Sequence, residues 1–307
     1  MAKLINRRKF IKYQAAGLLC LASSGIIRPG WLMAQPMPDI AVVKGSPGTA
    51  ARAAVELLGG MSRFVKKGSR VIIKPNMSFP VGPERASNTH PEVVKELAVM
   101  CRQAGASRVS ILDNPLAPQE LCLEKSGIAD SCRPVDDKMV HMVTNSSQYK
   151  ETDIPKGQSL TKTDIMKDVL NADVIIAAPV AKSHSGAGVS LCMKGMMGLI
   201  YDRMIMHRLD LHTGIVDLAT VLKPDLALID ATRVLSTGGP GGPGKVLKMD
   251  TIIASTDMVA ADAYAVSAFE WYGKQYKPSQ VKHIREAHNR GIGRMDIENL
   301  DIKTITV

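Results

Sequence analysis

The segment Arg70-Val71-Ile72-Ile73-Lys74-Pro75-Asn76 carries the strongest signal for the fold, because a β-branched run ends abruptly in polar residues. Such a run predicts a buried strand. Five similar runs predict further strands at 40–44, 108–113, 173–178, 225–230 and 251–255. Amphipathic helices are predicted at 49–58, 91–104, 163–171, 213–222 and 258–271, with a final helix at 279–289 and a strand at 301–307. This alternation predicts an α/β fold with a mainly parallel sheet and helices on both faces.

Polar residues follow the predicted strands at the point where each strand ends. Lys74 and Asn76 end the second strand, Asp113 the third and Asp230 the fifth. In sheets of this kind, ligands bind beyond the carboxyl ends of the strands. Lys74 is therefore a candidate to pair with a ligand carboxylate or phosphate, and Asn76 to orient it. A structural salt bridge and an Asn turn are equally consistent with the pattern.

Two further segments are candidates for ligand loops. His90 lies in Thr89-His90-Pro91-Glu92, which also has the pattern of a helix capping box with proline in the first turn. The glycine-rich run at 238–244 could wrap a ligand with free backbone amides, with Gly238 and Gly241 as candidates. This run lacks the Walker spacing, so a mobile lid or a plain loop is favoured over a phosphate cradle.

The densest chemistry follows the fourth predicted strand, in the segment AKSHSGAGVSLCMKGMMGL at 181–199. Its glycines permit close backbone approach, while lysine and histidine supply a cation and a proton carrier whose pKa burial can lower. We predict that Lys74, His184 and Lys194 are catalytic residues around one pocket, with Lys182 or Asp230 holding an anionic substrate. The alternative is a glycine-rich turn into a buried, methionine-lined helix from which Lys194 points outward.

Two histidines follow this segment closely. His207 and His212, with His184, could form a metal site or an acid/base set. Their five-residue spacing places them on different sides of an ideal helix, so a metal site would require a loop there. His283 and His288 have the same spacing, and we expect both to lie at the surface.

The charge balance argues against a nucleic-acid partner. The chain has 39 Lys and Arg against 29 Asp and Glu, a net charge of +10, but six basic residues lie before residue 35. About +4 then remains for the rest of the chain, with no dense basic cluster of the kind that nucleic acid requires. We predict no nucleic-acid partner. The apolar content and few aromatic residues predict a single α/β domain over residues 35–307 with one large or two modest, mainly aliphatic cores. The polar stretch 130–157 is a candidate insertion.

Cysteine spacing limits the cofactors that this chain can hold. Beyond Cys20 there are four cysteines, Cys101, Cys122, Cys132 and Cys192, and none forms a C-x-x-C pair. The chain therefore has no iron–sulfur cluster motif of the ferredoxin type. In an oxidising compartment a disulfide between Cys122 and Cys132 is permitted, although two buried thiols are at least as consistent with the sequence.

The first 34 residues have the pattern of an export signal. Asn6-Arg7-Arg8-Lys9-Phe10-Ile11-Lys12 is typical of a twin-arginine signal, and the apolar run at 13–27 is too short and diluted for a stable transmembrane span. We predict cleavage after Ala34 and a periplasmic protein delivered by the twin-arginine export machinery. An N-terminal amphipathic helix of the fold is the alternative. Export in the folded state favours a cofactor acquired before export, without identifying it.

Six segments, in order along the chain, match the pattern of a known family: Val71-Ile72-Ile73-Lys74-Pro75-Asn76, Thr89-His90-Pro91-Glu92, Lys182-Ser183-His184, Met193-Lys194-Gly195-Met196-Met197-Gly198-Leu199, Lys223-Pro224-Asp225-Leu226 and Ser255-Thr256-Asp257. With these segments the chain as a whole resembles the domain-of-unknown-function family 362. The resemblance implies an α/β fold and a protein associated with iron–sulfur or other redox systems. Some members carry a ferredoxin domain whose cysteines are missing here, so any cluster would sit on a redox partner protein.

A narrower resemblance concerns the residues from His184 to Lys194. Their spacing across a glycine-rich turn is similar to the stretch of nickel-pincer lactate racemases that holds a pyridinium cofactor, which implies Lys194 as the cofactor anchor and a racemase or isomerase activity. The chain departs from that pattern, since Leu191-Cys192-Met193 replaces the paired glycines before the lysine. Three hypotheses therefore stand: a redox-linked enzyme that binds a cofactor or small anion, a non-catalytic binding or assembly module, and a structural adapter with an exposed apolar patch and no enclosed pocket. Such a racemase is a further alternative.

Overall fold

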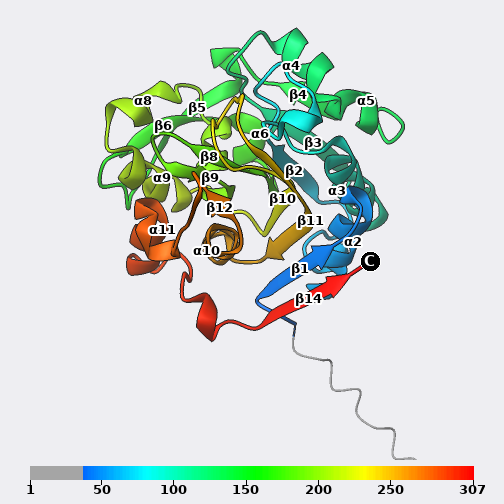
Figure 1. Cartoon of the computed structure of the whole chain (residues 1–307). Coiled ribbons are helices and arrows are strands. Elements are labelled where there is room, and N and C mark those ends of the chain that lie inside the picture. Colours follow the sequence, from blue (N-terminus) through cyan, green and yellow to red (C-terminus); the bar gives the residue numbers. More distant parts are fainter. Residues whose placement is uncertain (1–36) are drawn as a thin grey trace, which may run out of the picture. The chain divides into compact units, whose positions relative to one another are not determined.

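A ten-stranded sheet forms the centre of the computed structural model, which describes residues 37–307 as one compact unit. Eight strands lie in the order β14-β1-β11-β10-β7-β2-β3-β4, and β8 and β9 extend the sheet from β10 (Figure 1). The predicted signal and its cleavage site lie outside the described residues. The strands of this sheet are β1 (Ile40–Lys44), β2 (Arg70–Pro75), β3 (Arg108–Asp113), β4 (Val140–Met142), β7 (Val174–Ala178), β8 (Val180–His184), β9 (Gly188–Ser190), β10 (Leu226–Leu235), β11 (Val246–Ser255) and β14 (Ile302–Thr306).

Most neighbouring strands run parallel. β2 pairs with β3 and β7, β7 with β10, β3 with β4, and β1 with β14 in parallel, whereas β11 runs antiparallel to both β1 and β10. Buried parallel strands read as continuous apolar runs, which is why local sequence located them. The predicted fold class, a mainly parallel sheet in an α/β protein, is confirmed.

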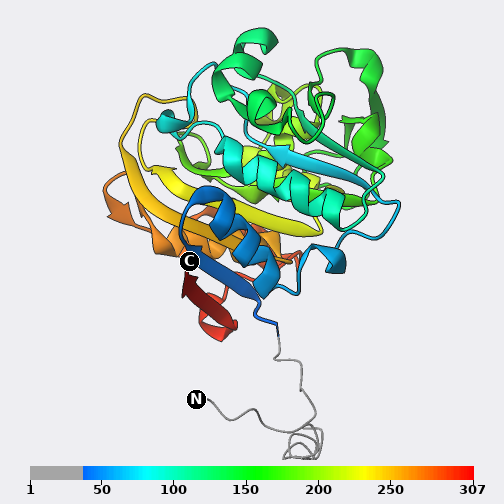
Figure 2. The same cartoon turned by 90° about the vertical axis from the view of Figure 1, so that its right-hand side faces the viewer.

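Helices cover both faces of the sheet (Figures 1 and 2). In β1, Ile40 and Val42 pack into one hydrophobic core, while Ala41 and Val43 pack into the other. This two-residue alternation is the geometry of a strand covered on both sides. The helices are α2 (Pro47–Leu57), α3 (Pro91–Gln103), α4 (Gln119–Ser126) and α5 (Ile128–Cys132), then α6 (Lys167–Leu170), α7 (Cys192–Gly195), α8 (Met204–Arg208), α9 (Leu211–Ala219), α10 (Met258–Ala268) and α11 (Lys282–Asn289).

Two predicted helices differ from the structure. The segment 163–171 is mostly β6 (Lys162–Met166), followed by the single turn α6, because Lys162–Met166 pairs with β5 (Tyr149–Asp153) as a hairpin. The helix predicted at 258–271 ends at Ala268, and Glu270–Trp271 forms the short strand β12, paired with β13 (Lys274–Gln275). The stretch 130–157 belongs to the same compact unit, since it supplies β4 to the sheet edge and β5 to the hairpin.

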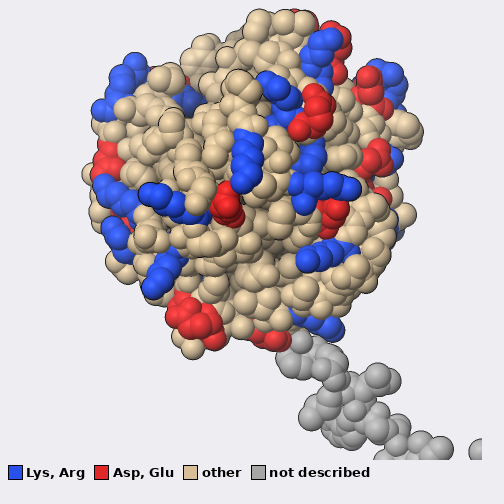
Figure 3. Space-filling view, in the orientation of Figure 1, with Lys and Arg blue, Asp and Glu red and all other residues tan. Residues whose placement is uncertain are grey.

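The described cysteines are buried thiols, and charges of both signs lie on the surface (Figure 3). Cys101, Cys122, Cys132 and Cys192 are all free and buried, so Cys122 and Cys132 are thiols rather than a disulfide. Basic and acidic side chains are intermixed on the face shown in Figure 3. Within residues 37–307, none of the helices is both long and apolar enough to cross a membrane.

Candidate functional site

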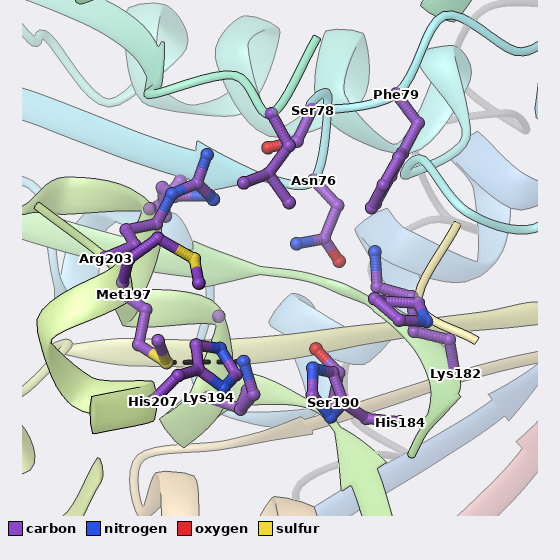
Figure 4. Close-up of a pocket in the computed structure, with 16 residues that line it drawn as sticks. Asn76, Ser78, Phe79, Lys182, His184, Ser190, Lys194, Met197, Arg203 and His207 are labelled. Carbon is purple, nitrogen blue, oxygen red and sulfur yellow. Dashed lines mark hydrogen bonds between the residues drawn. The ribbon is translucent and has the colours of Figure 1, made fainter. Parts of the chain in front are cut away.

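A cavity of about 170 Å³ opens beyond the end of β2, where it meets β8, β9 and α7 (Figure 4). The sequence pattern predicted a ligand site at these strand ends. Six predicted residues line the cavity together, namely Lys74, Asn76, Lys182, His184, Lys194 and His207. The remaining lining residues are Ser78, Phe79, Leu116, Ser190, Gly195, Met197, Gly198, Arg203, Met204 and Pro240.

Lys74 forms a buried ion pair with Asp113. Its Nζ lies 3.1 Å from Asp113 Oδ1, and the two side chains are 2% and 0% exposed. Asp113 Oδ2 also accepts hydrogen bonds from Met77 N at 3.0 Å and Ser78 Oγ at 2.7 Å. The pKa of Lys74 is lowered, because the effect of burial exceeds that of the neighbouring Asp113 carboxylate, which raises it. Asp113 was predicted to bind ligand, but it does not line the cavity. It contacts Lys74 and the loop after β2 and positions both.

Asn76 and Lys182 form a second part of the wall. Asn76 Oδ1 accepts a hydrogen bond from Val180 N at 3.1 Å, which leaves its NH₂ group free to donate into the cavity. Lys182 Nζ donates to the Ser87 carbonyl at 2.6 Å and lies 5.2 Å from the ring centroid of Phe79. Burial, aided by neighbouring cations, lowers the pKa of Lys182 to about 7.

Lys194 lies on α7, whose start is held by a buried carboxylate. Asp262 accepts hydrogen bonds from Cys192 N at 2.8 Å and Met193 N at 3.0 Å, and so fixes the turn that carries Lys194. Lys194 is only 8% exposed, and its Nζ lies 3.3 Å from Met197 Sδ (Figure 4). Burial, with a smaller contribution from Arg203, lowers the pKa of Lys194 to about 8. The predicted alternative, an outward-pointing Lys194, is wrong.

Two histidines lie beside Lys194. The rings of His184 and His207 are stacked, with centroids 6.0 Å apart. His184 Nδ1 accepts hydrogen bonds from Gly186 N and Ala187 N, both at 3.1 Å, so its ring carries a proton on Nε2 when neutral. Burial and the charge of Lys194 lower the pKa of His184 to about 3. His184 is therefore a neutral hydrogen-bond donor at physiological pH.

Charge in this cavity is unbalanced. Lys74, Lys182, Lys194 and Arg203 all line it, and among residues 37–307 only Asp113 forms an ion pair with any of them. Arg203 donates instead to the Asn114 carbonyl. Burying cations without carboxylates is unfavourable, so such a cluster is typical of a binding or catalytic site rather than of a structural core.

Asp230 and His90 are brought together away from the cavity. Asp230 is fully buried, accepts a hydrogen bond from His90 N at 2.8 Å and pairs with Arg233 at 3.0 Å. His90 is the N-cap of α3, and its Nδ1 accepts from Glu92 N at 3.2 Å. The capping alternative is therefore the one found, with His90 rather than Thr89 as the cap. Both residues brace the loop that leads into α3.

The glycine-rich run packs against the cavity wall. Gly239 N donates to Ser183 Oγ at 3.0 Å, and Pro240 lines the cavity. A Cβ atom on Gly241 would lie 2.9 Å from the Phe79 ring, so glycine permits this close approach. Gly238 has a φ of +72°, which favours glycine in the turn. Both candidates shape the loop around Phe79.

His207 and His212 do not share a site. His207 stacks on His184, whereas His212 stacks on His283 with the two Nδ1 atoms 3.4 Å apart. In the part of the chain that is described, no group of three or more His, Cys, Asp or Glu residues could hold a metal ion. The surface position predicted for His283 is wrong, because His283, Ile284 and Ala287 share the buried face of α11. His288 is half-buried.

Several lining residues were missed by sequence reasoning. Arg203 is the most important of them, because it brings a fourth cation to the cavity. It lies between a 3₁₀ turn and α8, where no periodic pattern marks it. Phe79 and Ser78 follow β2 directly, and attention to the whole loop after Asn76 would have found them.

The chain is similar to several known proteins. A thylakoid-associated protein of Synechocystis sp. is 29% identical over 230 residues, covering 71% of this chain and 68% of that protein. The lactate racemase apoprotein of Thermoanaerobacterium thermosaccharolyticum is 16% identical with a TM-score of 0.43, over 71% of this chain and 54% of that one. A Thermotoga maritima protein is 14% identical with a TM-score of 0.37, over 86% and 51%.

This chain thus spans about half of each solved chain that it matches. The sequence pattern of the family described as "Domain of unknown function (DUF362)" matches residues 71–267. That range includes every residue that lines the cavity. The protein belongs to this family.

Proposed function

We propose that the protein binds a small anionic ligand in the cavity beyond β2. The observation that carries this proposal is the convergence of Lys74, Lys182, Lys194 and Arg203 on one cavity with a single paired carboxylate. An anion would supply the missing negative charge and the oxygen acceptors that buried ammonium groups require. Oxygen atoms of a carboxylate or phosphate match these donors.

The size of the cavity restricts the range of ligands that it can hold. An apolar cavity of about 150 Å³ accommodates benzene, and the cavity here is about 170 Å³. Drug-sized ligands and organic cofactors occupy about 300–1,000 Å³. A volume of about 170 Å³ is closer to that of a compact anion than to the space an organic cofactor occupies, and Leu191-Cys192-Met193 replaces the paired glycines of the racemase pattern before Lys194. We therefore favour a compact anion over the racemase alternative.

Calorimetric titration tests the proposal. Oxalate, sulfate and phosphate are titrated into the protein at pH 7, and into Lys182→Met and Arg203→Met. We expect at least one of these anions to bind, with affinity reduced about tenfold or more in both variants, because each loses one buried cation–anion contact. Lys248→Met is the matched control, since Lys248 is 80% exposed on β11. Failure of all three anions to bind, or equal affinity in all variants, would refute the proposal.

We also propose that the protein acts in the periplasm after twin-arginine export. The support is the pair Arg7-Arg8 ahead of the weak apolar run at 13–27. An Arg7→Lys/Arg8→Lys variant should accumulate in the cytoplasm in cell fractionation, whereas Lys3→Arg should not. Equal export of the double variant would contradict this route.

Turnover of the bound anion distinguishes an enzyme from a binding or assembly module at this site. An enzyme converts the bound anion, and a binding or assembly module releases it unchanged to a redox partner protein. We propose a partner that carries an iron–sulfur cluster, because the four described cysteines are buried and unpaired. Capture of partners from the exported fraction, followed by iron and sulfide analysis, tests this. Capture of cluster-free proteins alone would contradict it.

A further inference from the structure

The three lysines of the cavity differ in what their ammonium groups contact. Lys74 Nζ pairs with the Asp113 carboxylate, and Lys182 Nζ donates to a backbone carbonyl. For Lys194, the only acceptor within reach of Nζ among residues 37–307 is the thioether of Met197, at 3.3 Å. A thioether is a weak acceptor. Among the three cavity lysines, Lys194 is therefore the one whose ammonium group has the weakest hydrogen-bond acceptor.

This setting favours the neutral amine. Lys194 is 8% exposed, lines the cavity and shares it with Arg203. Burial beside another cation lowers the pKa of a lysine, here to about 8, so a substantial fraction of the side chain is a free amine at mildly alkaline pH. Enzymes activate nucleophilic lysines in this way, by desolvation or by a neighbouring cation. Lys182 is also desolvated, with a pKa lowered to about 7, but its Nζ is held against the Ser87 carbonyl at 2.6 Å, whereas no oxygen acceptor among residues 37–307 holds Lys194 Nζ.

We propose that Lys194 forms an imine with the carbonyl carbon of a small oxo acid bound in the cavity. This inference rests on the proposed anion-binding function and names its substrate class. Arg203 and Lys182 lie on opposite sides of the cavity and offer donors to a carboxylate (Figure 4). A short oxo acid such as pyruvate is close to benzene in size and suits about 170 Å³.

The step balances without an oxidant or reductant. The lone pair of Nζ adds to the carbonyl carbon, forming a C–N bond, while the carbonyl oxygen takes up a proton and becomes a hydroxyl. Nitrogen loses a proton, the C–O bond then breaks, and the hydroxyl leaves as water with a second proton, which gives the C=N bond. The proton lost by nitrogen supplies the first of the two protons that the oxygen takes up, and water supplies the second. Neutral His184 keeps its Nε2 proton and hydrogen-bonds the oxygen through it, while His207 beside it is the cavity group able to carry a proton.

Reductive trapping tests the imine. The full-length protein is incubated with pyruvate and sodium cyanoborohydride at pH 8, and intact mass and peptide mapping locate any adduct. We expect one reduced pyruvyl group on Lys194, formed about tenfold or more faster than on exposed lysines, because burial provides the free amine and the bound geometry. Oxalate, an anion without a ketone, should slow this trapping by competition.

Two variants serve as controls. Lys194→Arg keeps the positive charge but lacks a nucleophilic amine, so it should bind oxalate and form no fast adduct. Lys248→Arg, at an exposed position, should trap pyruvate like the unmodified protein. If Lys194→Arg does not fold, peptide mapping of the unmodified protein, with and without oxalate, gives the answer alone.

The outcomes separate this inference from the proposed function. Oxalate binding without a fast adduct on Lys194 overturns the imine and leaves anion binding intact. Trapping spread evenly over exposed lysines also overturns it. Absence of binding by oxalate, sulfate, phosphate and pyruvate overturns the proposed function and the imine together.

Discussion

Replacing Lys194 by methionine should stabilise the protein when no ligand is bound. Methionine keeps an unbranched apolar stem of similar length and removes the charge. The exchange gives up no hydrogen bond to oxygen, because the Lys194 Nζ contacts only Met197 Sδ among the described residues. What is removed is a buried ammonium that folding must strip of water.

The magnitude follows from the lowered pKa. Burial brings the pKa of Lys194 from an ordinary 10.5 to about 8, and each unit corresponds to about 1.4 kcal/mol. At pH 7 the buried lysine therefore reduces the free energy of unfolding by about 3 kcal/mol. Between pH 8 and 10.5 the folded state binds fewer protons than the unfolded state, so stability rises with pH. The cost is full below pH 8 and is lost as pH rises through 10.5.

Urea denaturation at pH 7 and at pH 10.5 measures the effect. We expect Lys194→Met to raise the free energy of unfolding by up to about 3 kcal/mol at pH 7 and by less than about 1 kcal/mol at pH 10.5. Anion affinity should fall in the same variant, which is the usual exchange of function for stability. A variant that is destabilised at pH 7, or whose effect is the same at both pH values, would refute the reasoning.

Three further predictions follow from the same site. Lys74→Met should destabilise the protein by roughly 3–5 kcal/mol in urea denaturation, because it leaves the buried Asp113 carboxylate unpaired; adding Asp113→Leu should recover part of this loss. Oxalate affinity should fall as pH rises from 6 to 9 in calorimetry, since Lys182 and Lys194 lose protons near pH 7 and 8; a rise would contradict it. Asp262→Ala should cost about 1–3 kcal/mol of stability and weaken oxalate binding, because the start of α7 loses two backbone hydrogen bonds; unchanged affinity would contradict the positioning role.

The sheet could be predicted from sequence because its strands are buried on both faces. Continuous apolar runs such as Val174–Ala178 have few alternatives to a central strand. The segment 163–171 was harder, because the strand in it is half exposed and owes its conformation to pairing with Tyr149–Asp153. Long-range pairing of this kind leaves no local periodic signal.

The site was predictable where it follows the strands and not where loops complete it. Lys74 is the penultimate residue of β2, and Lys182 and His184 belong to the short strand β8, so topology brings them to one edge of the sheet. Arg203 reaches the same cavity from an irregular segment after the chain has turned back. Asp230 shows the opposite error. The strand predicted to end there continues to Leu235, and backbone N–H groups and Arg233 occupy the Asp230 oxygens.

Anomalous diffraction from a crystal grown with selenate at pH 7 tests the central claim most directly. We predict a selenium peak in the cavity, with selenate oxygens within hydrogen-bond distance of Lys194 Nζ and Arg203. The peak should be lost in a crystal of Lys194→Met. Selenate at surface lysines with no peak in the cavity would contradict the account.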